Sequence, residues 1–152
     1  MTASLFERVI VPVASEDDAK ATTAALARHA DAVSGTVVAV HVIEKAGGAP
    51  DKASVEQREL TAEEMFEVVR AELEGFDVDL ETDILYGTDV AETIVQAGHE
   101  ADATAIVFTP REGSRWLKLL TGDVALELIS DSDIPVVVLP DEQTSDEGTD
   151  DE

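Results

Sequence analysis

The sequence contains no cysteine, which excludes disulfide bonds, a thiolate nucleophile and any metal site built on sulfur. Basic residues are also few, since 10 lysines and arginines face 34 acidic residues and leave a formal net charge of −24. Such a polyanion offers no basic stripe to a nucleic acid backbone, so nucleic acid is not an expected partner. Long apolar runs are missing as well, and no stretch approaches the roughly 18 residues that indicate a membrane span.

Catalytic signatures are missing too. The sequence holds no phosphate-binding G-x-x-x-x-G-K-[ST], no nucleophile elbow G-x-S-x-G and no zinc-binding H-E-x-x-H. Its histidines, His29, His41 and His99, lie far apart and never at H-x-x-x-H spacing, so no metal site is predicted. Because no motif in the sequence pairs a nucleophile with a general base, we predict that the protein is not an enzyme.

The acidic excess indicates the solvent in which the chain works. Residues 1–15 show no basic and apolar leader, so a cytoplasmic protein is expected. Acid pairs such as Asp17 and Asp18 are predicted to lie on a solvated anionic shell that repels itself in dilute buffer. At molar salt the Debye length falls to about 3 Å, which screens this repulsion. We therefore expect a protein of a salt-rich cytoplasm; the alternative is an acidic protein that binds basic partners.

Short apolar segments alternate with amphipathic ones through the first 140 residues. Five apolar segments have the β-branched composition of strands, and they lie at residues 8–14, 36–44, 78–86, 104–108 and 134–140. The four segments between them show helical spacing of apolar residues. Ser15 or Asp17 is expected to cap the first helix and Gly35 to end it, while Asp89 opens the third helix and Gly98 closes it.

This order of elements predicts one α/β domain with a five-stranded, parallel, doubly wound sheet. The alternating third strand is typical of a sheet margin. The second helix is predicted to end at Gly75 and to face the core with Leu60, Met65, Phe66, Val69 and Leu73. Residues 1–140 form the predicted domain. Residues 141–152 carry seven acids and no apolar residue, so a disordered tail is predicted.

Residues 108–124, FTPREGSRWLKLLTGDV, connect the fourth strand to the last helix. They hold Arg111, Arg115 and Lys118, three of the ten basic residues. Ligands of doubly wound sheets bind beyond the carboxyl ends of the strands. Positive charge gathered at this place favours a site for an anionic small molecule, and the alternative is ion pairing with neighbouring carboxylates.

The folded part of the chain, residues 5–140, resembles the universal stress protein family. The resemblance is carried by IVPVA at 10–14, VVAVHVIE at 37–44, YGTDVAETIVQAGHEADATAIVF at 86–108 and GDVALELISDSDIPVVVLP at 122–140. It implies strand order 3-2-1-4-5, as in flavodoxin-like and adenine nucleotide alpha hydrolase-like folds, with a crevice between the first and fourth strands. It also implies a homodimer through the fifth strand, Pro135 to Leu139, because a second copy would cover this apolar edge.

Family members that bind ATP carry a loop of the form Gly-x-x-Gly, nine residues, then Gly-Ser or Gly-Thr, and an aspartate that ends strand one. Counting back from Gly122 places Thr109 and Glu112 at the two loop glycines. Asp123 stands at the Ser/Thr position, and Ala14 replaces the aspartate. The positions that match the lining of the nucleotide pocket in those members are Pro12, Val42, Arg111, Gly122 and Val124.

The acidic residues at two of these loop positions disfavour the binding of a triphosphate. Like charges about 4 Å apart cost about 4 kcal/mol at an effective dielectric near 20, and both Glu112 and Asp123 would face phosphate oxygens. The resemblance thus implies a stress-response regulatory module that does not bind ATP tightly. Gly113 and Ser114, next to Arg115, would let a shifted loop hold a smaller anion.

The role of the loop and the identity of its ligand stay open at this point. The loop at 109–123 is a nucleotide site that makes the protein an ATP- or AMP-binding switch or a slow ATPase, or it holds a smaller anion. A third alternative is a purely structural loop in which Asp123 caps the last helix. The module could also act as the regulatory partner of a membrane transporter, which the resemblance to soluble regions of some transporters implies.

Overall fold

The computed structural model describes residues 5–28, 35–44, 52–109 and 122–139. Strands and helices alternate along the whole of this chain, as predicted. In order they are β1 (Arg8–Pro12), α1 (Glu16–Ala27), β2 (Thr36–Glu44), α2 (Lys52–Leu73), β3 (Asp79–Gly87), α3 (Val90–Glu100), β4 (Ala105–Phe108), α4 (Gly122–Asp131) and β5 (Val136–Val138).

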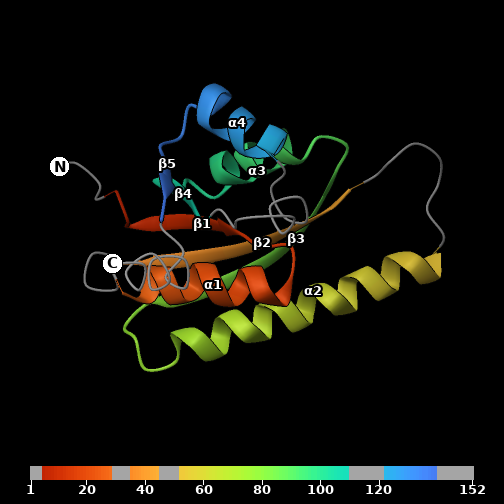
Figure 1. Ribbon diagram of the computed structural model, residues 1–152, viewed down its shortest axis with the longest axis horizontal. Coiled ribbons are helices and arrows are strands. Elements are labelled where there is room, and N and C mark those ends of the chain that lie inside the picture. The colour runs from red at the N-terminus through yellow and green to blue at the C-terminus, as the bar shows by residue number, and fades with distance from the viewer. Residues whose placement is uncertain (1–4, 29–34, 45–51, 110–121, 140–152) are drawn as a thin grey trace, which may run out of the picture.

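The strands form one parallel sheet in the order β3-β2-β1-β4-β5. This confirms the predicted order 3-2-1-4-5, and it confirms that the third strand lies at a margin. Figure 1 shows α1 and α2 on one face of the sheet and α3 and α4 on the other. The chain reverses its direction of winding at β1, which pairs with β2 on one side and with β4 on the other.

The hydrophobic core has two layers, one on each face of the sheet. Side chains of a strand point alternately to opposite faces. Val9 and Val11 of β1 therefore join Phe66 in the layer beneath α1 and α2. Ile10, the residue between them, joins Ile94 in the layer beneath α3 and α4. Burial of both faces explains why β1 is apolar from Val9 to Pro12.

The predicted caps Ser15 and Asp89 are confirmed. Ser15 Oγ accepts a hydrogen bond from the backbone N–H of Asp18 at 3.1 Å, and Asp89 Oδ1 accepts one from that of Glu92 at 3.0 Å. The prediction that the acid pair at 17–18 lies in solvent is wrong for Asp18, which is 2% exposed. Asp18 lies one helical turn before the buried Thr22, so it shares the face of α1 that is covered.

Gly35 does not end the first helix as predicted. That helix ends at Ala27 with Arg28 as its C-cap. Gly35 lies directly before β2, where an added Cβ would come within 2.0 Å of the carbonyl oxygen of Glu7. The glycine is therefore needed for the close approach of two backbone segments.

Two further predictions, one about α3 and one about α2, are wrong. Gly98 does not close α3, which continues to Glu100. An added Cβ at Gly98 would lie 2.6 Å from Cδ1 of Ile134, so a side chain there would require Ile134 to shift. Leu60 does not face the core, since it is 61% exposed. It lies two residues before the fully buried Ala62, so the two side chains point to different sides of α2.

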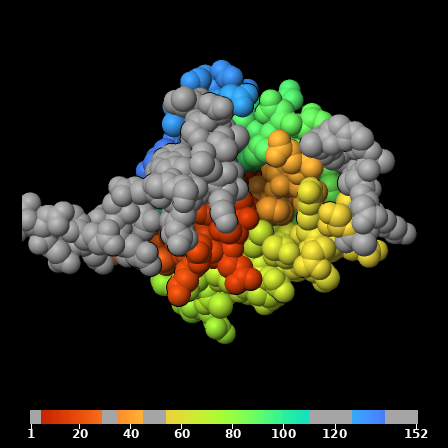
Figure 2. Space-filling model, turned by 45° about the vertical axis from the view of Figure 1, so that its right-hand side comes forward, coloured from red at the N-terminus to blue at the C-terminus, as the bar shows by residue number. Residues whose placement is uncertain are grey.

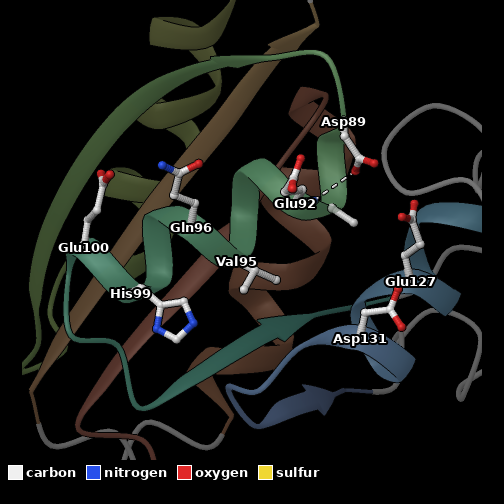
Figure 3. A pocket seen from close by; sticks show the side chains of 9 residues that line it. Asp89, Glu92, Val95, Gln96, His99, Glu100, Glu127 and Asp131 are labelled. Carbon is white, nitrogen blue, oxygen red and sulfur yellow. Dashed lines mark hydrogen bonds between the residues drawn. The ribbon is translucent and has the colours of Figure 1, made fainter.

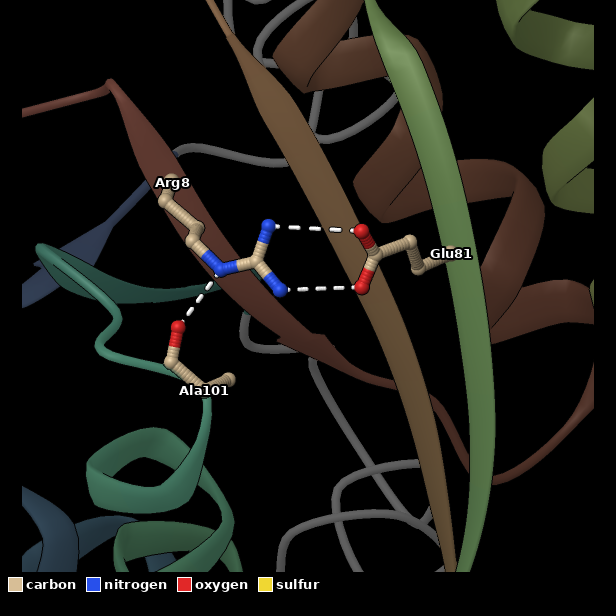
Figure 4. A network of polar contacts seen from close by, with 3 residues as sticks. All are labelled: Arg8, Glu81 and Ala101. Atoms are coloured by element: carbon tan, nitrogen blue, oxygen red, sulfur yellow. Dashed lines mark hydrogen bonds and ion pairs between the residues drawn. The ribbon is translucent and has the colours of Figure 1, made fainter.

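Arg8 joins three elements at the amino end of the sheet (Figure 4). Its Nη2 lies 2.9 Å from Oε1 of Glu81 on β3, and its Nε donates to the carbonyl oxygen of Ala101 at 2.6 Å. The backbone N–H of Arg8 also donates to Oγ1 of Thr104 at 3.0 Å. One of the few basic side chains thus has a structural role at the edge opposite the carboxyl ends of the strands.

The hydroxyl group of Tyr86, the only tyrosine, donates a hydrogen bond to a carboxylate oxygen of Glu59. This bond, then desolvation and the charges of Glu59 and Asp83, raise the pKa of Tyr86 above its ordinary value of 10.0. The bond therefore stabilises the fold below the ordinary pKa, and this contribution is lost as the pH rises through the higher pKa of the folded state. Ultraviolet titration of the phenolate should give a pKa above 10. Replacing Glu59 by Gln should bring it back toward 10, and an unchanged titration would argue against the contact.

Candidate functional site

The crevice at the switch point opens where β1 leaves β4. The ladder between these strands consists of Val9 with Ala105 and Ile10 with Ile106. The ladder between β1 and β2 continues to Pro12, and the backbone N–H of Val13 still donates to the carbonyl oxygen of Val40 at 2.9 Å. Beyond Ile10, β1 therefore follows β2 alone, as expected where doubly wound sheets bind ligands.

Three of the predicted site residues lie at this edge of the sheet. Pro12 is the buried last residue of β1, and Val42 is half-buried near the carboxyl end of β2. Thr109 directly follows β4. Ala14, at the position of the family's strand-one aspartate, is half-buried beyond β1. The strand ends thus place these residues along one edge.

Gly122, Asp123 and Val124 form the first turn of α4. Because the helix begins at Gly122, Asp123 lies inside this turn and the prediction that it is the N-cap is wrong. An acid in the first turn interacts favourably with the helix dipole, and it opposes any phosphate at the same helix end. The remaining predicted residues, Arg111, Glu112, Gly113, Ser114, Arg115 and Lys118, lie outside the described residues.

Thr109 has a buried hydroxyl group that lacks a hydrogen bond. The residue is 1% exposed, and its Oγ1 has no partner. Leaving such a group unsatisfied costs about 1–3 kcal/mol. Thr109 therefore places, directly after β4, a buried hydroxyl group whose hydrogen-bonding capacity the described residues leave unused.

A cavity of about 440 Å³ lies beside this edge, between the carboxyl ends of β1 and β2 and helix α2. Figure 2 shows β2 in orange next to α2 in yellow on this side of the molecule. Ligand pockets in proteins have volumes of about 300–1,000 Å³ and combine apolar walls with a few polar groups. The lining fits this description and comprises Ala14, His41, Val42, Ile43, Glu44, Gln57, Arg58, Thr61 and Met65.

The polar side chains of this cavity have defined partners. Nδ1 of His41 lies 2.8 Å from the carbonyl oxygen of Val13, which can only accept, so Nδ1 carries the hydrogen and Nε2 of the neutral ring is left as an acceptor. Oγ1 of Thr61 donates to the carbonyl oxygen of Gln57 at 3.0 Å. Arg58 supplies the positive charge of the cavity. No sequence motif pointed to Arg58, because only the apolar positions of α2 were informative.

A larger groove of about 640 Å³ runs between α3 and α4 (Figure 3). Its walls carry carboxylates from both helices, which are Asp89, Glu92, Glu100, Glu127 and Asp131. His99, also in this groove, has Nε2 at 2.7 Å from Oδ1 of Asp133. The groove repels anions, and no cluster of three or more metal-ligating side chains occurs among the described residues. The groove is therefore unsuited to an anionic ligand.

The strand order and the switch point between β1 and β4 define a doubly wound α/β domain. The sequence model of the Universal stress protein family matches residues 5–140, and the chain belongs to this family. No curated protein matches the chain in sequence. In the ranges that the structure covers, no helix has the length and apolarity needed to cross a bilayer.

Solved structures share the fold. A universal stress protein from Archaeoglobus fulgidus in complex with dAMP is similar at 24% identity and a TM-score of 0.63, covering 89% of this chain and 98% of that one. A family protein from Burkholderia pseudomallei is similar at 23% identity and a TM-score of 0.69, covering 91% and 99%. One from Arabidopsis thaliana with AMP bound is similar at 17% identity and a TM-score of 0.65, covering 89% and 92%.

Proposed function

We propose that this protein is a regulatory module of the stress response whose site takes a small anionic ligand and does not hold ATP tightly. The observation that carries this proposal is Thr109, buried at the end of β4 with a hydroxyl group that makes no hydrogen bond. Its side chain stands where a glycine would let backbone N–H groups approach a phosphate chain. Its hydroxyl group is suited to one small oxygen-bearing group.

Charge at the same edge supports the preference for a small anion. Asp123 lies in the first turn of α4, the helix end that would otherwise attract phosphate. Each added phosphate brings further negative charge toward this carboxylate, so repulsion grows from a monophosphate to a triphosphate. A ligand with one anionic group, such as a nucleoside monophosphate, meets less repulsion from this carboxylate.

Native mass spectrometry of protein purified in molar KCl tests the proposal. We expect no stoichiometric ATP in the preparation, because the affinity for ATP should correspond to a Kd weaker than about 0.1 mM, or less than about 5.5 kcal/mol of binding free energy. Protein that carries one ATP per chain through purification would contradict the proposal.

A second candidate function is an ATP- or AMP-binding switch or slow ATPase that uses the loop at 109–123. The adenine nucleotides in the similar structures from Archaeoglobus fulgidus and Arabidopsis thaliana favour it. Calorimetric titration with Mg-ATP at high KCl, followed by an assay for released phosphate, tests this function. Absence of both heat and phosphate release would remove it.

We also propose a type of activity, a cellular location and a partner for the module. The lack of catalytic signatures supports a binding protein that is not an enzyme, and the net charge of −24 supports a salt-rich cytoplasm. We further propose a membrane transporter as the regulated partner. Capture of a transporter by the full chain, lost when residues 141–152 are deleted, would support this partner.

We propose that the protein is a homodimer through Pro135 to Leu139. β5 is an edge strand, and Val138 on it is 46% exposed, which leaves an apolar edge for a second copy. Sedimentation in molar KCl should give a dimer for the native chain and a monomer after Val138→Lys, which places a charge in the interface. A native monomer, or a dimer that tolerates the lysine, would argue against this interface.

A further inference from the structure

Arg58 differs from other arginines of the described chain because it makes no ion pair there. Arg8 pairs with Glu81 at 2.9 Å and Arg70 pairs with Glu67 at 2.8 Å. Arg58 has only a 3.4 Å contact from Nη1 to the carbonyl oxygen of Glu44, which is at the limit of a hydrogen bond. In a chain with 34 acidic residues, an arginine without a carboxylate partner has donors available for another anion.

The surroundings of Arg58 suit a small amphipathic ligand. Val42 and Met65 give the cavity apolar walls, while Glu44 is the one carboxylate among the described residues that line it. This wall therefore has roughly balanced charge, unlike the groove between α3 and α4 with its five carboxylates. An anion therefore meets less repulsion in this cavity than in that groove.

We propose that Arg58 binds the phosphate of a nucleoside monophosphate in the cavity between β2 and α2. This inference rests on the proposed function, because Val42 and Ala14 lie at the same carboxyl edge of the sheet as Thr109, which does not itself line this cavity. It locates the phosphate at α2, away from the acid in the first turn of α4. A planar guanidinium can donate two parallel hydrogen bonds to one phosphate, which a point charge cannot reproduce.

Other groups of the cavity complement the rest of such a ligand. A flat base or a sugar face packs against apolar side chains, and the thioether of Met65 makes favourable contacts with aromatic rings. Nε2 of His41 is an acceptor in the neutral ring and can receive a hydrogen bond from an amino or hydroxyl group of the ligand. The volume of about 440 Å³ falls in the range of ligand pockets.

Calorimetric titrations of the full chain in molar KCl with AMP and with adenosine test the inference. Native protein should bind AMP more tightly than adenosine. Arg58→Gln should weaken AMP binding about tenfold or more and leave adenosine binding unchanged, because only the phosphate contact is lost. Arg58→Lys should recover part of the loss, since it keeps the charge without the planar fork.

Arg70→Gln is the matched control, because it removes the same charge from the same helix about 18 Å away. At molar KCl the Debye length is about 3 Å, so this change should leave AMP binding unaffected. Equal AMP binding by native protein and Arg58→Gln, or no preference of native protein for AMP over adenosine, would overturn the inference alone. Failure of native protein to bind AMP, adenosine and inorganic phosphate would overturn the proposed small-anion site and the inference with it.

Discussion

Transfer from about 2 M to about 0.1 M KCl is expected to lower the Tm of this protein by at least about 10 °C. At a net charge of −24 the acidic side chains repel one another. Asp89, Glu92 and Glu127 along the groove between α3 and α4 are an example. In dilute salt their repulsion acts over about 10 Å, and in molar salt over about 3 Å. Each kcal/mol of repulsion shifts the Tm of a domain this size by about 2–4 °C.

Thermal melts at a series of KCl concentrations measure this effect, and sucrose is the control. Sucrose favours the compact state by exclusion from the surface but screens no charge. The Tm should rise steeply with KCl and only slightly with sucrose. A Tm that is independent of KCl would contradict the proposed adaptation to a salt-rich cytoplasm.

Asp123→Ser is expected to increase the affinity for ATP about tenfold, which corresponds to about 1.4 kcal/mol of binding free energy. The substitution removes a carboxylate from the first turn of α4 and supplies a hydroxyl group at a helix end that favours phosphate. The gain should be smaller for AMP, because a monophosphate brings less charge toward this position.

Asp131→Ser is the matched control, since it removes the same charge from the last residue of the same helix, about 12 Å away. Calorimetric titration with Mg-ATP in molar KCl should show the increase for Asp123→Ser only. If both variants bind ATP like the native chain, the acid at the start of α4 is not what limits the affinity.

The fold could be predicted from the sequence where burial leaves a periodic signal. β2 was predicted at residues 36–44 and is found at Thr36–Glu44, because a β-branched run between a glycine and charged residues is typical of a buried strand. The resemblance added the strand order, which periodicity alone does not contain. Ser15 and Asp89 were found as caps because their side chains act on nearby backbone N–H groups.

Wrong predictions depended on contacts between distant parts of the chain. Gly35 and Gly98 were interpreted as helix ends, and each is required by a neighbour far away in sequence, Glu7 and Ile134. Leu60 is apolar, but it lies on the side of α2 away from the buried Ala62 and Phe66, and the packing of the helix decides which side is covered. Tertiary position overrides local preference in each case.

The candidate site was predicted in part. Pro12, Val42 and Thr109 were placed at strand ends by the resemblance, and the structure locates all three along the carboxyl edge. The cavity and Arg58 could not be predicted, because the lack of an ion pair becomes visible only when the positions of the carboxylates are known. The loop at 110–121, with Arg111 and Arg115, lies outside the described residues.

We propose that the sheet edge accepts one phosphate better than three. Parallel calorimetric titrations of native protein with AMP and with Mg-ATP in molar KCl test this preference. We predict that AMP binds at least about tenfold more tightly than ATP, a difference of about 1.4 kcal/mol. Binding of ATP more tightly than AMP would contradict the claim.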